Sequence, residues 1–333
     1  MNPPEIDADL AAFLDRLPKT ETHLHLEGAI PWKLLREFDA VRFGDEPAFF
    51  HPEFRYADFD HFNRVILDHA VAWFTSADRY AQVARIVFAG LVEQNVKYLE
   101  TSVHLGAIAH LPESGPEALA AIRAEVPAGL EVRIFLGMCR DDYGRMGTKI
   151  EEALEWEGLD GIDLHGVETL PLEAWTDDVW RRAREKGKFT KAHAGEFGPA
   201  AQVREVVERL GVDRIEHGVR AADDPEVVAF LIDRGVTLDV CPVSNLKLQV
   251  VPSIQTHPIA KLHAAGVRCT VNSDDPFFFG TTLHNEYAAL AREGGFSRKE
   301  LARLARNGFD IALLPETARA HWRAEIDALI GKL

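Results

Sequence analysis

Thr22-His23-Leu24-His25-Leu26-Glu27-Gly28 alternates polar and apolar residues near the start of the chain. This period of two predicts a β-strand, on which residues i and i+2 point to the same face. The two histidines then project side by side and could bind one metal ion, while the two leucines pack on the other face. The glycine allows a sharp turn after the strand. An isolated His-x-His fits a strand with a wet face about equally well, so its interpretation depends on the rest of the chain.

Apolar, strand-like runs alternate with segments of helical periodicity along the whole chain. The further predicted strands are 96–104, 131–139, 159–165, 189–193, 214–217, 236–241 and 268–274. The predicted helices include 116–126, 150–156, 177–186, 200–210, 225–234 and 259–265. With the opening stretch there are eight strands, and this alternation predicts an α/β fold, a (β/α)₈ TIM-type barrel. No linker or repeat divides the chain, so we expect one domain over residues 1–333.

Two segments exceed what a barrel needs. Residues 31–95 are rich in aromatic residues and too long for one crossover, so we expect extra helices over the barrel mouth. Most of these aromatic residues are expected to complete a core, while Phe59 and Phe62 are our candidates for a substrate lid. Residues 297–333 are expected to form terminal helices, interrupted at 310–316, that pack on the barrel and carry no chemistry.

The composition limits the partners. The 333 residues carry a formal net charge of −16, which argues against nucleic acid and anionic membranes as partners. No apolar run approaches the length of a membrane span. The three cysteines form no C-x-x-C pair and fit buried, inert thiols in a reducing cytoplasm. The start of the chain lacks the pattern of a signal peptide. The sequence carries no signal for an oligomeric state.

Polar residues follow four of the predicted strands, at the end where barrel enzymes carry their reactive groups. Besides the opening stretch, these endings are His193-Ala194-Gly195-Glu196, Glu216-His217-Gly218 and Asn272-Ser273-Asp274-Asp275-Pro276. Burying such groups is unfavourable unless they are paired or bind metal. Three histidines and one carboxylate, without thiolates, suit Zn²⁺ with an open position for water. The predicted ligands are His23, His25, His193 and Asp274.

Zinc lowers the pKa of bound water toward ~7 and so supplies hydroxide at neutral pH. Glu196 follows the third histidine closely enough to act as general acid and base. His217 could hold the hydroxide, and Asp275 could bind substrate. Each also has a purely structural reading, as a helix cap for Glu196, a core histidine for His217 and a turn or helix start for Asp275. Taken together with the His-x-His, the chemical reading is favoured.

These motifs, with Cys241-Pro242-Val243-Ser244-Asn245, resemble the adenosine and adenine deaminase family of the amidohydrolase superfamily. The resemblance runs from about residue 17 to 289. It implies hydrolytic deamination of a small-molecule 6-aminopurine, in purine salvage, with one Zn²⁺ per chain. It also implies that Glu196 protonates purine N1 and that His217 orients the hydroxide beside Asp274. It further implies that Asp275 contacts purine N7 and that the Gly166 backbone donates a hydrogen bond near N3. The metal ligand His25 is also expected on the substrate side.

The markers of substrate are mixed. Glu27 stands where nucleoside deaminases of this family usually carry Asp, and its longer side chain reaches into the space of a ribose. Residues 241–251 also resemble the adenine branch, whereas Leu164-His165-Gly166 resembles the nucleoside branch. Adenine, adenosine and a larger adenine nucleoside such as aminodeoxyfutalosine all remain open.

Two further readings remain. Another mononuclear amidohydrolase activity would keep the metal, and the absence of Lys at the end of the fourth strand favours a single ion over two. A catalytically silent binding protein on the same fold would lack Glu196 or a metal ligand, and both are present.

Overall fold

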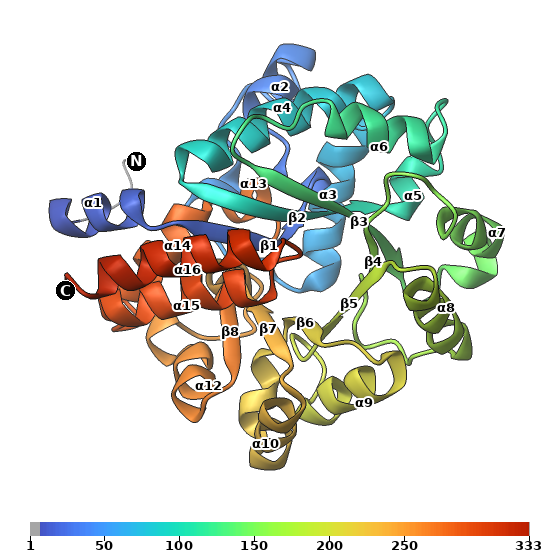
Figure 1. The fold of residues 1–333 in the computed structure, drawn as a ribbon. Helices are drawn as coiled ribbons and strands as arrows, with labels where there is room; N and C mark the ends of the chain where they lie inside the picture. The colour runs from blue at the N-terminus through green and yellow to red at the C-terminus, as the bar shows by residue number, and fades with distance from the viewer. Residues whose placement is uncertain (1–6, 333) are drawn as a thin grey trace.

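The computed structural model describes residues 7–332 as a barrel of eight parallel strands in sequential order (Figure 1). The strands are β1 (Lys19–His25), β2 (Val96–His104), β3 (Glu131–Cys139), β4 (Gly161–His165), β5 (Phe189–Ala194), β6 (Arg214–His217), β7 (Thr237–Val240) and β8 (Arg268–Val271). The barrel closes beyond β8, where the His25 N–H donates to the Asp274 carbonyl and the Asp274 N–H donates to the His23 carbonyl, each at 3.0 Å. The predicted (β/α)₈ barrel is confirmed.

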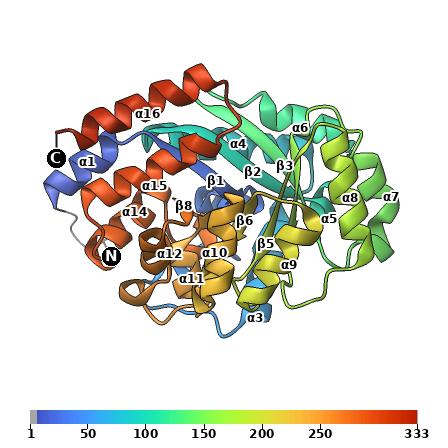
Figure 2. The same ribbon diagram turned by 60° about the horizontal axis from the view of Figure 1, so that its bottom comes forward.

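Helices surround the strands (Figures 1 and 2). They are α1 (Ala8–Arg16), α2 (Trp32–Phe38), α3 (Phe59–Trp73), α4 (Ala77–Glu93), α5 (Leu105–Ile108), α6 (Gly115–Arg123), α7 (Tyr143–Ala153), α8 (Ala174–Glu185), α9 (Ala200–Leu210), α10 (Pro225–Arg234), α11 (Pro242–Lys247), α12 (Ile259–Ala265), α13 (Pro276–Phe279), α14 (Leu283–Arg292), α15 (Arg298–Ile311) and α16 (Glu316–Ile330). Short 3₁₀ helices are η1 (Glu27–Ala29), η2 (Ala48–Phe50), η3 (Val219–Asp223) and η4 (Ile254–Thr256).

The predicted strand ends are corrected at several places. The last strand ends at Val271, so Asp274 lies past it and joins Leu24 only through an isolated bridge. The fourth strand begins at Gly161, later than predicted, whereas the first begins at Lys19, before the alternating stretch. The reason is that strand limits follow pairing with neighbouring strands, which the apolar runs do not reveal. The alternation itself is confirmed, because Leu24 and Leu26 are buried.

The predicted helical insertion after β1 is confirmed as α2, η2, α3 and α4. Phe62 is buried and stacks on Phe279, with ring centroids 5.0 Å apart, so it belongs to the core. Phe59 is half-buried and lies edge-on to Phe197, with ring centroids 5.4 Å apart. Phe197 directly follows the predicted acid Glu196 in the chain. Of the two lid candidates, only Phe59 therefore touches the loop that carries the site.

The C-terminal helices pack on the barrel wall, as predicted. Ser297 and Glu300 form a capping box that starts α15. A Cβ on Gly308 would lie 1.9 Å from the Thr20 hydroxyl, so glycine allows α15 to approach β1 closely. In Figure 2, α16 lies on the opposite side of the molecule from α3. The tail therefore lies away from α3, the helix of the insertion that carries Phe59 and Phe62.

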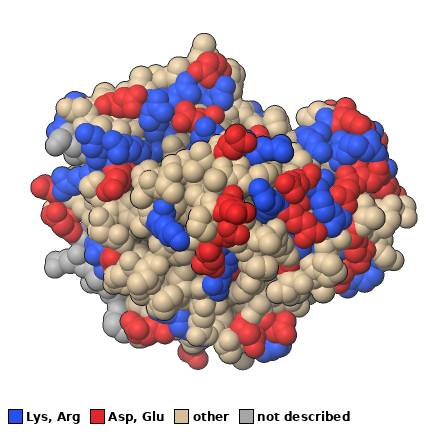
Figure 3. All heavy atoms as spheres, turned by 90° about the horizontal axis from the view of Figure 1, so that it is seen from below, with Lys and Arg blue, Asp and Glu red and all other residues tan. Residues whose placement is uncertain are grey.

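The surface and the helices also bear on partners. None of the helices within residues 7–332 combines the length and apolar composition of a membrane span. Figure 3 shows acidic and basic side chains interspersed around a broad area of uncharged residues on one face of the molecule. The excess negative charge of the chain is therefore not gathered into one patch on that face.

Candidate metal-dependent active site

The structure brings the four predicted metal ligands together at the carboxyl ends of β1, β5 and β8. His23, His25, His193 and Asp274 each offer a ligand atom, and these atoms all lie within 4.8 Å of one another. The Nε2 atoms of His23 and His25 both lie 3.3 Å from Asp274 Oδ1. Two histidines two residues apart on a strand, and two groups from distant strands, thus surround one small volume.

Hydrogen bonds on the far side of the imidazoles fix which nitrogen faces that volume. His23 Nδ1 lies 3.2 Å from the Asp239 carbonyl. His193 Nδ1 lies 2.8 Å from Glu216 Oε2 and 3.1 Å from the Leu164 carbonyl. Since Nδ1 donates in both rings, Nε2 keeps its lone pair for a metal. His23 Nε2 is fully buried and has no hydrogen-bond partner within residues 7–332, as expected for an atom that binds a cation.

The electrostatic field of the site favours a cation. Burial would lower the pKa of His23, but the carboxylates of Glu216 and Asp274 raise it above its usual value. Burial would raise the pKa of Asp274, yet the neighbouring imidazoles of His23 and His25 hold it well below its usual range. Ser244 also donates to Asp274 Oδ2 at 2.7 Å. The three histidines and one aspartate, the unpartnered Nε2 of His23 and the surrounding negative charge all fit Zn²⁺.

Two of the predicted site residues adopt the left-handed backbone conformation. His217 has φ 62° and Asp274 has φ 63°, values that are unfavourable for residues with a Cβ. Each conformation turns the chain off a strand end and aims the side chain at the cluster. Such strain is of order 1–3 kcal/mol per residue and persists where the surrounding structure holds it.

Glu196 lies beside the cluster in a loop whose backbone is hydrogen-bonded to another carboxylate, that of Glu168. Glu168 accepts hydrogen bonds from the backbone N–H groups of Gly195, Glu196 (3.0 Å) and Phe197 (2.8 Å). Burial, reinforced by the charges of Asp274 and Glu168, raises the pKa of Glu196 well above its usual value. This raised pKa favours the protonated form of Glu196, which can donate a proton. It does not cap α9, whose N-cap Pro199 receives no side-chain hydrogen bond.

His217 completes the group around the cluster. Its Nε2 lies 3.5 Å from Glu196 Oε2 and 3.8 Å from Asp274 Oδ2. Burial and the nearby His23 lower the pKa of His217 well below its usual value, so the ring is neutral. Asn245 contacts both groups, at 3.1 Å from Glu196 Oε1 and 3.2 Å from His217 Nδ1.

Asp275 packs against the turn after β1. A Cβ at Gly28 would lie only 1.7 Å from Asp275 Oδ1, so glycine is required for this contact. Burial and the adjacent Asp274 raise the pKa of Asp275 well above its usual value. Asp275 precedes α13, as a helix start would, but its side chain makes no capping hydrogen bond. The raised pKa favours the protonated form of Asp275, which can donate a hydrogen bond.

Two hydrogen bonds hold the Glu27 carboxylate in place. Its Oε1 accepts hydrogen bonds from the Tyr80 hydroxyl at 2.5 Å and from the His104 N–H at 2.9 Å. Next to it, His104 Nδ1 and His165 Nε2 lie 2.9 Å apart. Burial lowers the pKa of both histidines, so this pair is neutral. Glu27 and the two histidines form one wall of the mouth.

Gly166 follows β4 with φ 81°, and a Cβ there would lie 2.7 Å from Cys139 Sγ. All three cysteines are free; Cys241 and Cys269 are buried as expected, whereas Cys139 is only half-buried. Burial raises the pKa of the Cys139 thiol, so it stays protonated. The expectation of inert thiols holds, but that of full burial is wrong for Cys139, because it lies at the open strand end.

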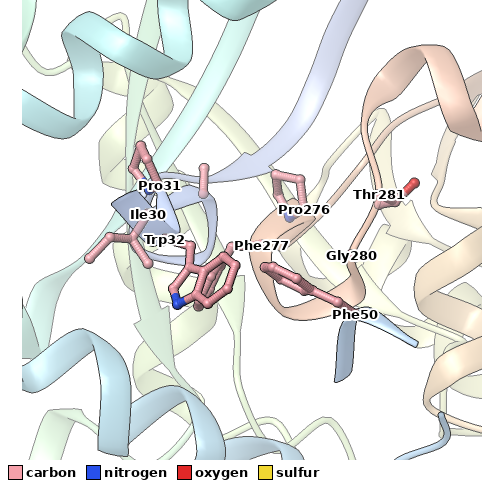
Figure 4. A pocket seen from close by; sticks show the side chains of 9 residues that line it. Ile30, Pro31, Trp32, Phe50, Pro276, Phe277, Gly280 and Thr281 are labelled. Atoms are coloured by element: carbon pink, nitrogen blue, oxygen red, sulfur yellow. The ribbon is translucent and has the colours of Figure 1, made fainter. Parts of the chain in front are cut away.

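A hollow of about 400 Å³ lies beside the site (Figure 4). Trp32, Phe50 and Phe277 line it together with residues flanking Gly28 and Asp275. None of the metal ligands, Glu196 or His217 borders it. The hollow is therefore bordered by the chain neighbours of Gly28 and Asp275 and is not itself lined by the candidate catalytic residues.

Sequence reasoning missed several residues that position the site. They are Glu168 and Asn245, which hold Glu196; Tyr80, which holds Glu27; and Asp163, Lys191 and Glu216, which surround His193. Several of these residues lie in or beside the motifs of the sequence analysis, Asn245 and Glu216 among them, but the sequence analysis gave none of them a role. The one available signal was that such polar residues end or interrupt apolar runs.

A (β/α)₈ barrel with three histidines, one aspartate and a protonated glutamate at its strand ends defines a hydrolase of the amidohydrolase superfamily. The sequence model of a family described as adenosine deaminase matches residues 18–329. An aminodeoxyfutalosine deaminase of Streptomyces coelicolor is 32% identical over 339 residues, which cover 97% of this chain and 87% of that protein. An adenine deaminase of Chlorobium luteolum is 33% identical over 317 residues, which cover 91% and 92%.

The solved structures agree. The crystal structure of an amidohydrolase from Burkholderia ambifaria with bound zinc superimposes with a TM-score of 0.83 at 25% identity, covering 99% of this chain and 96% of that one. The chain therefore belongs to the adenosine deaminase family. It is a hydrolase that acts on the C–N bonds of cyclic amidines.

Proposed function

We propose that this chain catalyses the hydrolytic deamination of a small-molecule 6-aminopurine, adenine or adenosine, in purine salvage. The observation that carries the proposal is the convergence of the four-ligand cluster with Glu196, whose pKa is raised, and His217, whose pKa is lowered. The reaction adds water at C6, breaks the bond to the exocyclic nitrogen, and releases ammonia and the 6-oxopurine. We further propose that residues 1–333 form one domain and that the enzyme acts in the cytoplasm, where its free cysteines stay reduced.

His23, His25, His193 and Asp274 would hold one Zn²⁺ per chain. When bound there, the ion would acidify a water molecule and make it a nucleophile at neutral pH. The unpaired Nε2 of His23 and the engaged Nδ1 atoms of His23 and His193 support this ligand set.

The remaining residues act on the substrate and its protons. Glu196 donates a proton to ring N1, which makes C6 a better electrophile. The Nε2–H of His217 orients the attacking water, and the ionised Asp274 accepts a proton from it and passes the proton to the leaving amine. Asp275, protonated because it is buried beside Asp274, donates to ring N7. The raised pKa of Glu196 and the lowered pKa of His217 fit the roles of these two residues.

The remaining contacts bear on the size of the substrate. Gly166 would present its N–H toward ring N3. Glu27 would face the N9 side, where the hydrogen bonds from Tyr80 and His104 hold its carboxylate in place. A neutral pair, His104 and His165, lies beside it and offers no cation to a phosphate group. These observations favour a base or nucleoside over a nucleotide.

The similarity to the Streptomyces coelicolor deaminase supports a second candidate, aminodeoxyfutalosine, which is a larger adenine nucleoside. An ultraviolet deamination assay with zinc-loaded protein would compare adenine, adenosine, deoxyadenosine and aminodeoxyfutalosine by kcat/KM. We expect one of them to be preferred clearly, and preference for adenine would assign to Glu27 the exclusion of ribose. Turnover of none, with one zinc ion bound per chain, would contradict the proposed substrate class. Two tightly bound ions would contradict the mononuclear site.

A further inference from the structure

A chain of hydrogen bonds runs from the start of α12 to the two groups that carry the reactive protons. Ile259 donates its backbone N–H to His257 Nδ1 at 3.1 Å. His257 Nε2 lies 3.2 Å from Asn245 Oδ1, and Asn245 Nδ2 contacts both Glu196 and His217. His257 and Asn245 are buried, at 3% and 0% exposure, so water does not compete for these contacts.

The direction of every bond in this chain follows from its first member. A backbone N–H can only donate, so His257 Nδ1 must be an acceptor without a proton. The proton of His257 therefore sits on Nε2 and is donated to Asn245 Oδ1. Burial, which lowers the pKa of His257 to about 4, is consistent with a neutral ring. The oxygen of the Asn245 amide is thereby identified, and its NH₂ group must point the other way.

The NH₂ group of Asn245 has two hydrogens and two acceptors. One hydrogen goes to Glu196 Oε1 at 3.1 Å and the other to His217 Nδ1 at 3.2 Å. Because His217 Nδ1 accepts a hydrogen bond from Asn245, a single proton on the His217 ring must be on Nε2. Because Glu196 Oε1 accepts from Asn245, the proton that Glu196 delivers as an acid is placed on Oε2. Those two atoms are 3.5 Å apart and border the metal cluster.

We propose that Asn245 and His257 are positioning residues that place both reactive protons, on His217 Nε2 and on Glu196 Oε2, toward the reacting centre. His257 sets the orientation of the Asn245 amide, and that amide sets the tautomer of His217 and the proton position of Glu196. Neither residue touches the ligand cluster itself. This inference rests on the proposed roles of Glu196 and His217, and it adds to them the reason why each proton faces the right way.

The first test is the tautomer of His217, read by nitrogen NMR of protein labelled with ¹⁵N-histidine and loaded with zinc. The resonances of His217 are assigned by their loss in His217→Gln. We expect Nδ1 to resonate as an unprotonated nitrogen and Nε2 as a protonated one. A protonated Nδ1 in the wild-type protein would overturn the proposal, whatever the enzyme turns over.

The second test compares two variants of His257. His257→Gln keeps a donor near the position of Nε2, whereas His257→Phe keeps a ring without a donor. We expect His257→Phe to lower kcat roughly 10–100-fold with little change in KM, as is typical for partners behind reactive groups. We expect His257→Gln to retain most of the rate. His263→Gln, in helix α12, which begins two residues after His257, is the matched control and should leave kcat unchanged.

A third variant reverses the polarity of the amide. Asn245→Asp has nearly the same shape but cannot donate to Glu196 or His217, so His217 Nδ1 should become protonated and kcat should fall roughly 10²–10⁴-fold. If both His257 variants lose activity equally and the His217 resonances stay unchanged, the residues are merely structural and the proposal fails. If the tautomer is as expected but no 6-aminopurine is turned over, the proposed function fails and the bond directions stand.

Discussion

The barrel holds two clusters of buried charge that differ in how completely they are paired. Deep in the barrel, Arg214 binds Glu100 at 3.2 Å and Asp239 at 2.6 Å. Tyr98 donates to Glu100, and Thr270 donates to Asp239. At the mouth, by contrast, His23 Nε2 has no hydrogen-bond partner within residues 7–332.

This difference indicates that the Arg214 cluster serves stability and that the cluster at the mouth serves chemistry. Around Arg214, hydrogen-bond donors compensate the desolvation of each carboxylate, and the residues are satisfied without a ligand. At the mouth, the imidazoles and Asp274 leave atoms aimed at a common volume that only an added cation can fill. We therefore expect substitutions in the Arg214 cluster to affect folding and substitutions at the mouth to affect turnover.

The largest effect is expected from Glu196→Gln. The amide keeps the shape and still accepts from Asn245, but it cannot donate an acidic proton to the substrate. We expect kcat to fall about 10²–10⁴-fold, with zinc content and thermal midpoint unchanged. Steady-state kinetics, elemental analysis and thermal unfolding check this together, and full retained activity would refute the acid role.

Arg214→Met should give the opposite pattern. Removal of the guanidinium leaves Glu100 and Asp239 buried without a cation, which destabilises a protein by about 3–5 kcal/mol. Urea unfolding measures the change, and kcat per folded, zinc-loaded enzyme should stay close to wild type. Arg85→Met is the matched control, because Arg85 pairs with Glu125 at an exposed site and should change stability by less than about 1 kcal/mol. Equal losses from the two arginines would contradict the contrast between buried and exposed pairs.

The loss of folding stability at acidic pH should depend on His257. Burial lowers its pKa from the usual 6.5 to about 4 in the folded protein, so the unfolded chain binds the proton more readily between these values. Its contribution to stability is therefore fully present above pH 6.5 and is lost as the pH falls toward 4. The difference of about 2.5 pKa units corresponds to about 3 kcal/mol.

Urea unfolding of wild type and His257→Gln at pH 7 and near pH 4 would measure this difference. We expect the stability of the glutamine variant to fall less steeply over that range. Parallel curves for the two proteins would show that other groups govern the acid limb.

The smallest effect is expected from Tyr80→Phe. Loss of the hydroxyl removes one of the two hydrogen bonds that hold Glu27 Oε1 and leaves the other, from the His104 N–H. We expect KM for the preferred substrate to rise by up to about tenfold, equivalent to about 1.4 kcal/mol, with kcat nearly unchanged. A large fall in kcat instead would place Glu27 in the chemical step.

Contacts that follow from the periodicity of a single strand or helix could be predicted from the sequence. His23 and His25 share a face because strands repeat every two residues, and the structure places them beside each other. Helices α9, α10 and α12 begin and end where their periodicity and glycine stops predict. The placement of His193, Glu196, His217 and Asp274 near the first strand followed once a barrel was inferred, because carboxyl ends of parallel strands meet at one edge.

Residues that meet across the fold were not predictable in the same way. Glu168 clasps three amides of a loop almost 30 residues later, and Asn245 bridges Glu196 and His217 from a third element. Nothing in the local periodicity marks these contacts, since each depends on loop conformation after a strand. The left-handed conformations of His217 and Asp274 likewise depend on what surrounds them.

The sequence by itself determined the barrel and the candidate metal ligands and acid, because residue type and period are local properties of the chain. Only the tertiary structure decided which nitrogen of His23 and His193 faces the candidate metal site, what raises the pKa of the Glu196 and Asp275 carboxyls, and what holds Glu27. Those properties depend on burial and on hydrogen bonds between distant segments, which exist only once the eight strands have closed.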